Sequence, residues 1–206
     1  KKEKLLSKKD LTKKTGIQFD EKNLLVTYHP VTLENQTSQK HFQALLDVLH
    51  DLDDVYLIFT MPNADSDGRV IKDMINEFVL SHGDRSIAFT SMGHLNYLST
   101  LQFVYGVVGN SSSGLTEVPT FKIGTINIGD RQKGRLKAKS VIDCEPSKES
   151  IKNAVDTLYS EDFQKMLPSV MNPYGEGDAT DKIIDVLKNT EIPQEPKKEF
   201  YDLLKI

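Results

Sequence analysis

The sequence contains a single cysteine, no long apolar run and no excess of positive charge. Cys144 has no second cysteine to pair with, so an internal disulfide is excluded, and we expect the reducing cytoplasm as the compartment. No apolar run approaches the roughly 20 residues that a membrane-spanning helix needs. The formal net charge of −4 argues against a broad surface for nucleic acid or anionic membrane. Neither partner is therefore expected, and any phosphate site has to be local.

Several motifs of well-known sites are also absent. We find no Cys/His spacing typical of zinc, no Walker glycine-lysine loop, no dinucleotide-binding Gly-x-Gly-x-x-Gly and no serine nucleophile elbow. Asp65, Asp67 and Gly68 resemble part of a calcium loop, but the glutamate required further along is missing. We therefore expect neither a metal nor a cofactor. No close carboxylate pair lies at an identifiable rim position, so proton-transfer groups are expected elsewhere.

The composition and the pattern of apolar residues predict an α/β domain. With 206 residues, 38% of them hydrophobic, the chain can bury a full core. Apolar β-type runs alternate with helical periodicity over short connections, which is typical of βαβ units and a parallel sheet covered on both faces. The expected strands are 23–28, 55–60, 86–89, 104–108, 125–128 and 141–143. The expected helices are 8–14, 37–52, 69–80, 94–101, 147–158, 179–188 and 197–204.

A turn rich in glycine and serine, Gly109–Gly114, follows the fourth expected strand directly. The next residues, Leu115–Val118, have the pattern of a first helical turn. Peptide N–H groups and the positive end of a helix dipole attract phosphate, and small residues allow its close approach. The alternative is an ordinary serine-capped helix, and these residues alone favour neither interpretation.

Further polar residues follow other strands and are expected at the same rim. Ligands of doubly wound sheets bind outside the carboxyl ends of the strands. His29, Asn63 and Met92 each follow a strand, and Arg131 and Arg135 follow the fifth. We therefore expect these residues to converge with the Gly109–Ser113 turn.

Each polar candidate also has a purely structural interpretation. His29 can be a structural imidazole, and Asn63 after a proline is often a turn residue. Arg131 can be a solvated surface charge. Glu117, near a helix start, either interacts with the helix dipole or accepts hydrogen bonds from the vicinal diol of a ribose. Taken singly, the structural interpretations are favoured; their shared position on one rim favours a nucleotide site.

Several blocks of the sequence together resemble the C-terminal half of the hydrolysing UDP-N-acetylglucosamine 2-epimerases of sialic-acid-type sugar synthesis. The resemblance covers about Leu24 to Leu187, and the order and spacing of the blocks match. The matching blocks are Leu25–Thr32 (LVTYHPVT), Pro62–Asp65 (PNAD), Gly109–Gly114 (GNSSSG) with Glu117, Gly129–Arg135 (GDRQKGR) and Tyr174–Ala179 (YGEGDA).

The resemblance implies a glycosyltransferase-B-like fold of two Rossmann-like halves, of which this chain is the nucleotide-binding one. Residues 1–22 would be a linker from an N-terminal domain, 23–189 the Rossmann-like UDP-binding domain and 190–206 a tail helix. The implied reaction eliminates UDP and hydrates the 2-acetamidoglucal to a free 2-epimeric amino sugar such as N-acetylmannosamine. The acid and base carboxylates would lie in the N-terminal domain, so the chain alone is expected to be inactive. A homo-oligomer is expected for the full-length enzyme.

The resemblance also assigns roles to the residues of the matching blocks. His29 would assist the leaving group and contact the diphosphate. The remaining residues expected to bind UDP, or the UDP part of a UDP-N-acetylhexosamine, are Asn63 and Met92 around the uracil, Ser111 and Ser112 at the phosphates, Glu117 at the ribose diol, and Arg131.

Three other kinds of protein remain open on sequence alone. The donor-binding half of a glycosyltransferase with the same architecture would also use a helix N-terminus for phosphate and a glutamate for ribose. A non-catalytic nucleotide-binding or receiver-like module has the same sheet, although a receiver needs an acidic cluster where His29-Pro30 stands. A module that serves only assembly is the third possibility.

Overall fold

The structure is a computed structural model that describes residues 4–31, 37–62, 68–175, 177 and 179–191. Its contacts divide the chain into two units, 1–174 and 175–206, and each is described by itself. The domain boundaries expected after residues 22 and 189 stay a prediction. The tail helix expected over 197–204 and the candidate Asn63 lie outside the described residues.

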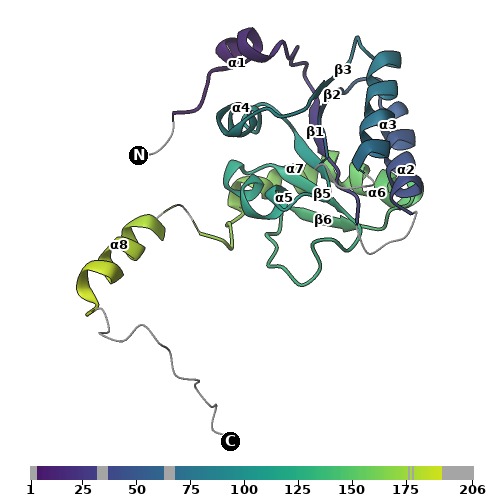
Figure 1. Cartoon of the computed structure of the whole chain (residues 1–206). Coiled ribbons are helices and arrows are strands. Elements are labelled where there is room, and N and C mark those ends of the chain that lie inside the picture. The colour runs from purple at the N-terminus through teal and green to yellow at the C-terminus, as the bar shows by residue number, and fades with distance from the viewer. Residues whose placement is uncertain (1–3, 32–36, 63–67, 176, 178, 192–206) are drawn as a thin grey trace, which may run out of the picture. The chain divides into compact units, whose positions relative to one another are not determined.

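The described part of the first unit contains one sheet of six parallel strands, in the order β3-β2-β1-β4-β5-β6 (Figure 1). The strands are β1 (Asn23–Thr27), β2 (Tyr56–Thr60), β3 (Ser86–Phe89), β4 (Gly106–Gly109), β5 (Gly124–Ile128) and β6 (Val141–Cys144). All residues of β1, β4 and β5 are buried, because helices cover both faces of the sheet. The strand order reverses between β1 and β4, which defines the switch point of the fold.

The helices are α1 (Lys8–Thr15), α2 (Ser38–His50), α3 (Gly68–Ser81), α4 (His94–Thr100), α5 (Ser113–Thr116), α6 (Lys148–Tyr159), α7 (Glu161–Met166) and α8 (Ala179–Asn189), with 3₁₀ turns η1 (Val118–Phe121) and η2 (Leu167–Ser169). The predicted α/β class and the alternation of strands and helices are confirmed. Ser147 caps α6, since its Oγ accepts from the Ser150 N–H at 3.3 Å. Helix α7 and both 3₁₀ turns were not predicted from the sequence.

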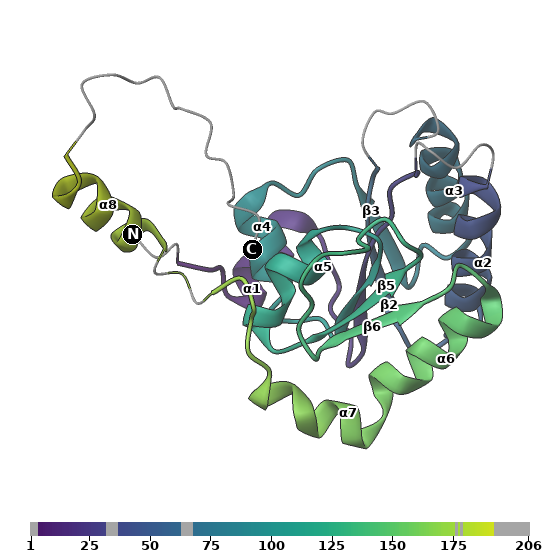
Figure 2. The same cartoon turned by 90° about the horizontal axis from the view of Figure 1, so that it is seen from below.

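Two apolar layers pack against the two faces of the sheet. Helices α2, α3 and α6 bury their apolar sides with Leu24, Val26 and Phe59 on one face. Helix α4, η1 and Ile17 cover the other face with Leu25 and Ile58. Figures 1 and 2 show the same division, with α6 and α7 following one another along one side of the molecule. The core thus holds the strand ends, and the loops that follow them, in fixed register.

The segment before β1, expected to be a linker with a short helix, forms α1 and packs on the body of the unit. Ser7 caps the helix by accepting from the Asp10 N–H, and Leu11 is fully buried. The Leu6 N–H donates to Ser99 Oγ at 3.0 Å, which ties this segment to α4. The segment therefore contributes to the core.

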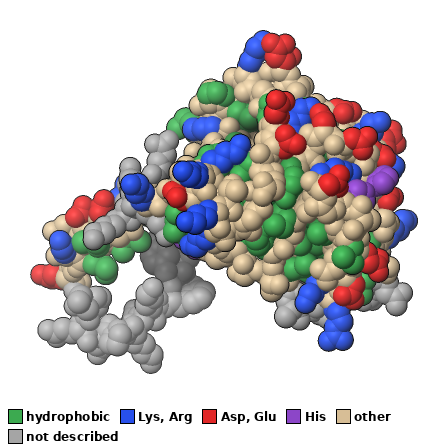
Figure 3. All heavy atoms as spheres, turned by 90° about the horizontal axis from the view of Figure 1, so that it is seen from above, with side chains coloured by type: hydrophobic (Ala, Val, Ile, Leu, Met, Phe, Trp, Pro, Cys, Tyr) green, Lys and Arg blue, Asp and Glu red, His purple; other side chains and the backbone are tan. Residues whose placement is uncertain are grey.

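In the view of Figure 3, acidic and basic side chains both appear on the surface of the first unit. In the second unit, α8 exposes the apolar side chains of Ile183, Ile184, Val186 and Leu187. None of the helices in the described ranges has the length and apolarity to cross a membrane.

Leu158 of α6 is the clearest test of the core. It is fully buried, and a Cβ added at Gly124 would lie 2.3 Å from its Cδ1, so the helix packs directly on the strand backbone. We expect Leu158→Ala to lower the free energy of unfolding by about 2–5 kcal/mol, through lost burial and an incompletely filled cavity. Leu80, 85% exposed on α3, is the matched control, and its alanine variant should change stability by less than about 0.5 kcal/mol. Urea denaturation measures both; equal midpoints for the two variants would contradict this packing.

Cys144 at the end of β6 gives a second test. Burial raises the pKa of its thiol to about 12, and the neighbouring Asp143 and Glu145 charges add to that shift. Relative to the ordinary thiol pKa of 9.0, this shift strongly lowers the thiolate fraction at neutral pH. We expect a disulfide reagent to modify the folded chain far more slowly than the urea-unfolded chain at pH 8. Similar rates in both states would show that the thiol is not shielded.

Candidate functional site

The candidate site begins where β1 and β4 end together at the switch point. Thr27 is in register with Gly109, and this is the last pair of the two strands. Gly109 has φ +139°, and a Cβ there would lie 1.9 Å from the carbonyl oxygen of Thr27. Only glycine fits this approach, because any side chain would collide with the neighbouring backbone. The two chains therefore leave the sheet from directly adjacent points.

Beyond that pair, the side chain of Asn110 joins the two loops. Its Oδ1 accepts from the His29 N–H at 2.8 Å, and its Nδ2 donates to the His29 carbonyl at 2.8 Å. Asn110 is 1% exposed. The amide thus replaces a strand neighbour for His29, whose successor Pro30 has no N–H with which to continue a ladder. The predicted convergence of His29 with the Gly109–Ser113 turn is present in the structure.

The loop after β5 reaches the same point. Arg131 Nη1 donates to the Asn110 carbonyl at 3.0 Å, and Gln132 Nε2 donates to the same oxygen at 2.8 Å. Gln132 is buried, whereas Arg131 and Arg135 are exposed. Arg135 belongs to the same turn, since its N–H donates to the Gln132 carbonyl at 3.3 Å. Arg131 therefore joins the candidate site through the backbone of Asn110.

The turn after Asn110 presents hydrogen-bond donors. In the part of the chain that the structure describes, the peptide N–H groups of Ser111 and Ser112 have no acceptor. Ser111 Oγ accepts from the Ser113 N–H at 3.4 Å, which leaves its own hydroxyl hydrogen available. Neighbouring N–H groups and hydroxyls suit an anion, because their hydrogen bonds stabilise its negative charge without a charged side chain.

Tyr97 of α4 fixes the third serine of the turn. Its hydroxyl donates to Ser113 Oγ at 2.7 Å. Burial raises the pKa of Tyr97 to about 12, an effect that the hydrogen bond to Ser113 opposes and the nearby Glu117 charge supports. Tyr97 therefore keeps its proton at physiological pH, and Ser113 accepts that bond. The Ser113 hydroxyl hydrogen remains available for another acceptor.

Glu117 and Met92 lie on the α4 side of the turn. The Glu117 N–H donates to the Ser113 carbonyl at 3.0 Å, its side chain is partly exposed, and its charge acts on Tyr97. The Met92 side chain is buried in the apolar cluster against which Tyr97 packs. The Met92 carbonyl accepts from Asn96 Nδ2 at 2.7 Å. Met92 has no hydrogen bond to the Ser111–Ser113 turn itself.

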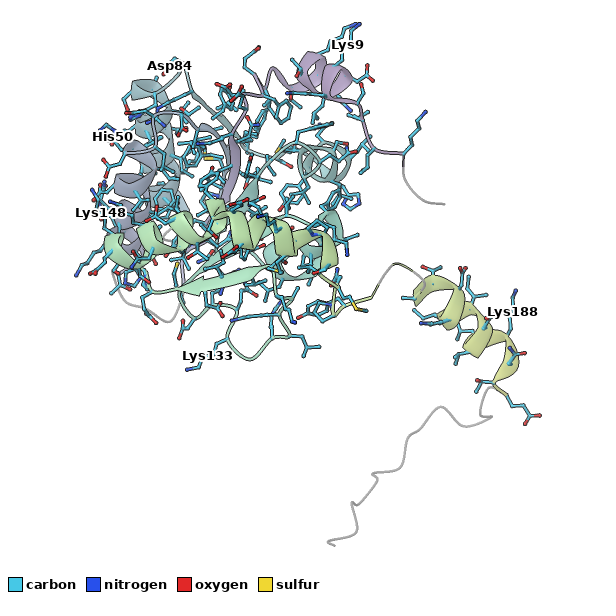
Figure 4. All side chains as sticks on the ribbon, turned by 180° about the vertical axis from the view of Figure 1, so that it is seen from behind. Lys9, His50, Asp84, Lys133, Lys148 and Lys188 are labelled. Atoms are coloured by element: carbon cyan, nitrogen blue, oxygen red, sulfur yellow. The ribbon has the colours of Figure 1, made fainter. Side chains whose placement is uncertain are left out.

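Most of the basic loop after β5 faces away from this turn. Lys137 Nζ contacts both carboxylate oxygens of Asp143 at 2.8 Å, and Lys133 projects outward in Figure 4. Both line a separate cavity of about 700 Å³ together with Glu145 and Cys144. Among the described residues, no group of three or more His, Cys, Asp or Glu side chains could hold a metal ion. The chemistry available at the candidate site is therefore that of hydrogen-bond donors, the His29 imidazole, the Arg131 guanidinium and the Glu117 carboxylate.

The sequence did not indicate three residues of this site, Asn110, Gln132 and Tyr97. Asn110 stands inside the quoted Gly109–Gly114 block, but its partner His29 is 81 positions away, so no local pattern shows the contact. A polar residue directly after a strand-ending glycine was the available signal. Tyr97 was counted within a helix, and nothing in its spacing indicates the bond to Ser113.

The chain is similar to known proteins over most of its length. A GDP/UDP-N,N'-diacetylbacillosamine 2-epimerase (hydrolyzing) of Campylobacter jejuni is 38% identical over 96% of this chain and 51% of its own length. The polysialic acid biosynthesis protein P7 of Escherichia coli is 32% identical over 97% of this chain and 51% of its own. This chain thus spans about half the length of both curated relatives.

A solved structure of Staphylococcus aureus MnaA with UDP superimposes with a TM-score of 0.66. The superposition covers 88% of this chain and 48% of the MnaA chain, with 17% sequence identity. This similarity supports the Rossmann-like fold. The model of the UDP-N-acetylglucosamine 2-epimerase family matches residues 2–188. The chain therefore belongs to the UDP-N-acetylglucosamine 2-epimerase family.

Proposed function

We propose that this chain is the UDP-binding half of a hydrolysing 2-epimerase that acts on UDP-N-acetylglucosamine or a related UDP-amino sugar. The observation that carries the proposal is the meeting of three loops at the switch point around Asn110. Family membership supports a UDP sugar as the ligand, since one named relative is a GDP/UDP-N,N'-diacetylbacillosamine 2-epimerase and the MnaA structure was solved with UDP. The same membership favours an epimerase over the donor half of a glycosyltransferase.

The nucleotide would lie across the ends of β1 and β4. The N–H groups and hydroxyls of Ser111 and Ser112 would donate to the phosphate oxygens, and Arg131 would add its charge. Glu117, one helical turn further on, would accept from the ribose hydroxyls, because two carboxylate oxygens match a vicinal diol. Asn63 and the chain around Met92 remain the proposed surroundings of the uracil.

These groups would act mainly on the leaving group. Removing the C2 proton while the bond from C1 to the phosphate oxygen breaks gives a 2-acetamidoglucal and leaves both electrons of that bond on UDP. Donors aimed at the phosphate stabilise the charge that develops there, and His29 would contribute at the same oxygen. Water then adds its hydroxyl group to C1 and a proton to C2. The new proton reaches C2 on the face opposite to that from which the original proton was removed.

The proton-transfer carboxylates are proposed to lie in the part of the relatives that this chain does not span. Among the described residues, no carboxylate pair accompanies His29 and Ser111 at the switch point, and the proposed role of Glu117 is to bind the ribose. The proposal also keeps a cytoplasmic site of action, supported by the unpaired Cys144, and a homo-oligomeric full-length enzyme.

The role of Glu117 can be tested with this chain. We expect Glu117→Ala to weaken UDP binding about 10- to 100-fold, the effect of losing hydrogen bonds to a charged group. Glu149→Ala, an exposed carboxylate on α6, is the control and should bind UDP like the unaltered chain. Isothermal titration calorimetry measures both. Titration with 2′-deoxy-UDP adds a sharper comparison, since the missing hydroxyl should weaken the unaltered chain and change Glu117→Ala little. Unchanged affinity in Glu117→Ala would remove the ribose assignment.

The proposed separation of UDP binding from proton transfer leads to a second prediction. The chain alone should bind UDP but release none from UDP-N-acetylglucosamine, because the groups that take the C2 proton are absent from it. A coupled assay for free UDP measures turnover, and proton exchange at C2 in deuterated water checks for partial reaction. Appreciable UDP release or exchange by the isolated chain would contradict the assignment of the acid and base groups to the other half.

A further inference from the structure

A buried asparagine lies at each end of the paired strands β1 and β4 and bonds to neighbouring backbone groups. At the start of β1, Asn23 Nδ2 donates to the carbonyls of Asp20 at 2.9 Å and Phe103 at 3.0 Å. At the other end, Asn110 holds both main-chain groups of His29. Asn23 is 3% exposed and Asn110 is 1% exposed. The two residues thus have the same type of side chain and similar burial. They differ in position, because Asn23 lies where β1 begins and Asn110 lies where β4 ends.

The geometry at Asn110 also fixes the orientation of its amide. The His29 N–H can only donate and the His29 carbonyl can only accept, so Oδ1 has to face the former and Nδ2 the latter. Pro30 has no N–H, so a ladder of backbone bonds cannot continue through the residue after His29. Both main-chain groups of His29 are instead bonded to the Asn110 side chain, which holds the His29 main chain beyond the sheet.

The backbone of Asn110 adds a second connection. Its N–H donates to the Thr27 carbonyl at 3.2 Å, and its own carbonyl accepts from Arg131 and Gln132. A displacement of Asn110 would consequently move the β1 loop and the attachment point of Arg131 together. Ser111, the next residue, would move with them. One residue thus couples the positions of three groups that the proposed function assigns to the diphosphate.

We propose that Asn110 is a positioning residue of the nucleotide site: its side-chain amide holds the His29 main chain, and its carbonyl holds Arg131, in the places that diphosphate binding requires. This inference rests on the proposed function. Asn110 itself need not contact the ligand, because its side-chain amide is already bonded to His29 and its exposure is 1%.

The test compares Asn110→Ala with Asn23→Ala in this chain. Both remove a buried amide that joins segments beside β1 and β4, so both should lower the midpoint of thermal unfolding. UDP affinity measured by calorimetry should fall about tenfold in Asn110→Ala and stay unchanged in Asn23→Ala, because only the former loses bonds at the ligand edge. Amide hydrogen exchange should show faster exchange at His29 in Asn110→Ala alone. Asn110→Ser, which leaves a hydroxyl in the space, serves if the alanine variant fails to fold.

A double-mutant cycle with His29→Ala distinguishes positioning from a general loss of structure. If Asn110 acts through His29, the loss caused by Asn110→Ala should be smaller in the His29→Ala background. Unchanged UDP affinity in Asn110→Ala or an equal fall in Asn23→Ala would overturn the positioning role, and equal losses in both backgrounds would overturn positioning through His29. These outcomes leave the proposed function standing, whereas failure of the unaltered chain to bind UDP would overturn both.

Discussion

The parallel pairing of β1 with β4 is the constraint on which the rest of the site depends. The pairing ends at Thr27 and Gly109, where the two backbones approach so closely that only glycine fits. Both chains must then turn away from the sheet at the same place, on opposite sides of the reversal in strand order. The apolar layers on the two faces keep this pair in register, so the loops after it have a rigid base.

Several polar groups of the site beyond these strand ends already have hydrogen-bond partners within the protein. Tyr97, which its raised pKa keeps protonated, donates to Ser113, and Asn110 can pair with His29 in one orientation only. The bond from Tyr97 leaves the Ser113 hydroxyl with a hydrogen that it can donate outward. A preorganised set of donors costs little reorganisation when negative charge develops on a leaving group. The proposed role in UDP departure follows from this property of the turn.

The sequence was sufficient for the α/β class, for the alternation of elements and for the meeting of His29 with the 109–113 turn. Those features depend on periodicity and on the rule that parallel strands end at one edge, and both can be read locally. The role of Asn110 could not be predicted, since its amide pairs with His29 across 81 positions. Tyr97 and Ser113 likewise meet only after α4 packs on the sheet. Helix α7 was missed because Ser160, its cap, directly follows another helix with no loop between them.

The central claim is that UDP binds to this chain at the ends of β1 and β4. Titration of the isotopically labelled chain with UDP, followed by the amide signals of its backbone, tests this most directly. The account predicts that the largest shifts fall on Ser111, Ser112 and Glu117 with the neighbouring His29, while amides at the opposite edge, around Asn23, stay in place. Shifts confined to another surface, such as the cavity beside Lys137, or no shifts at all, would contradict it.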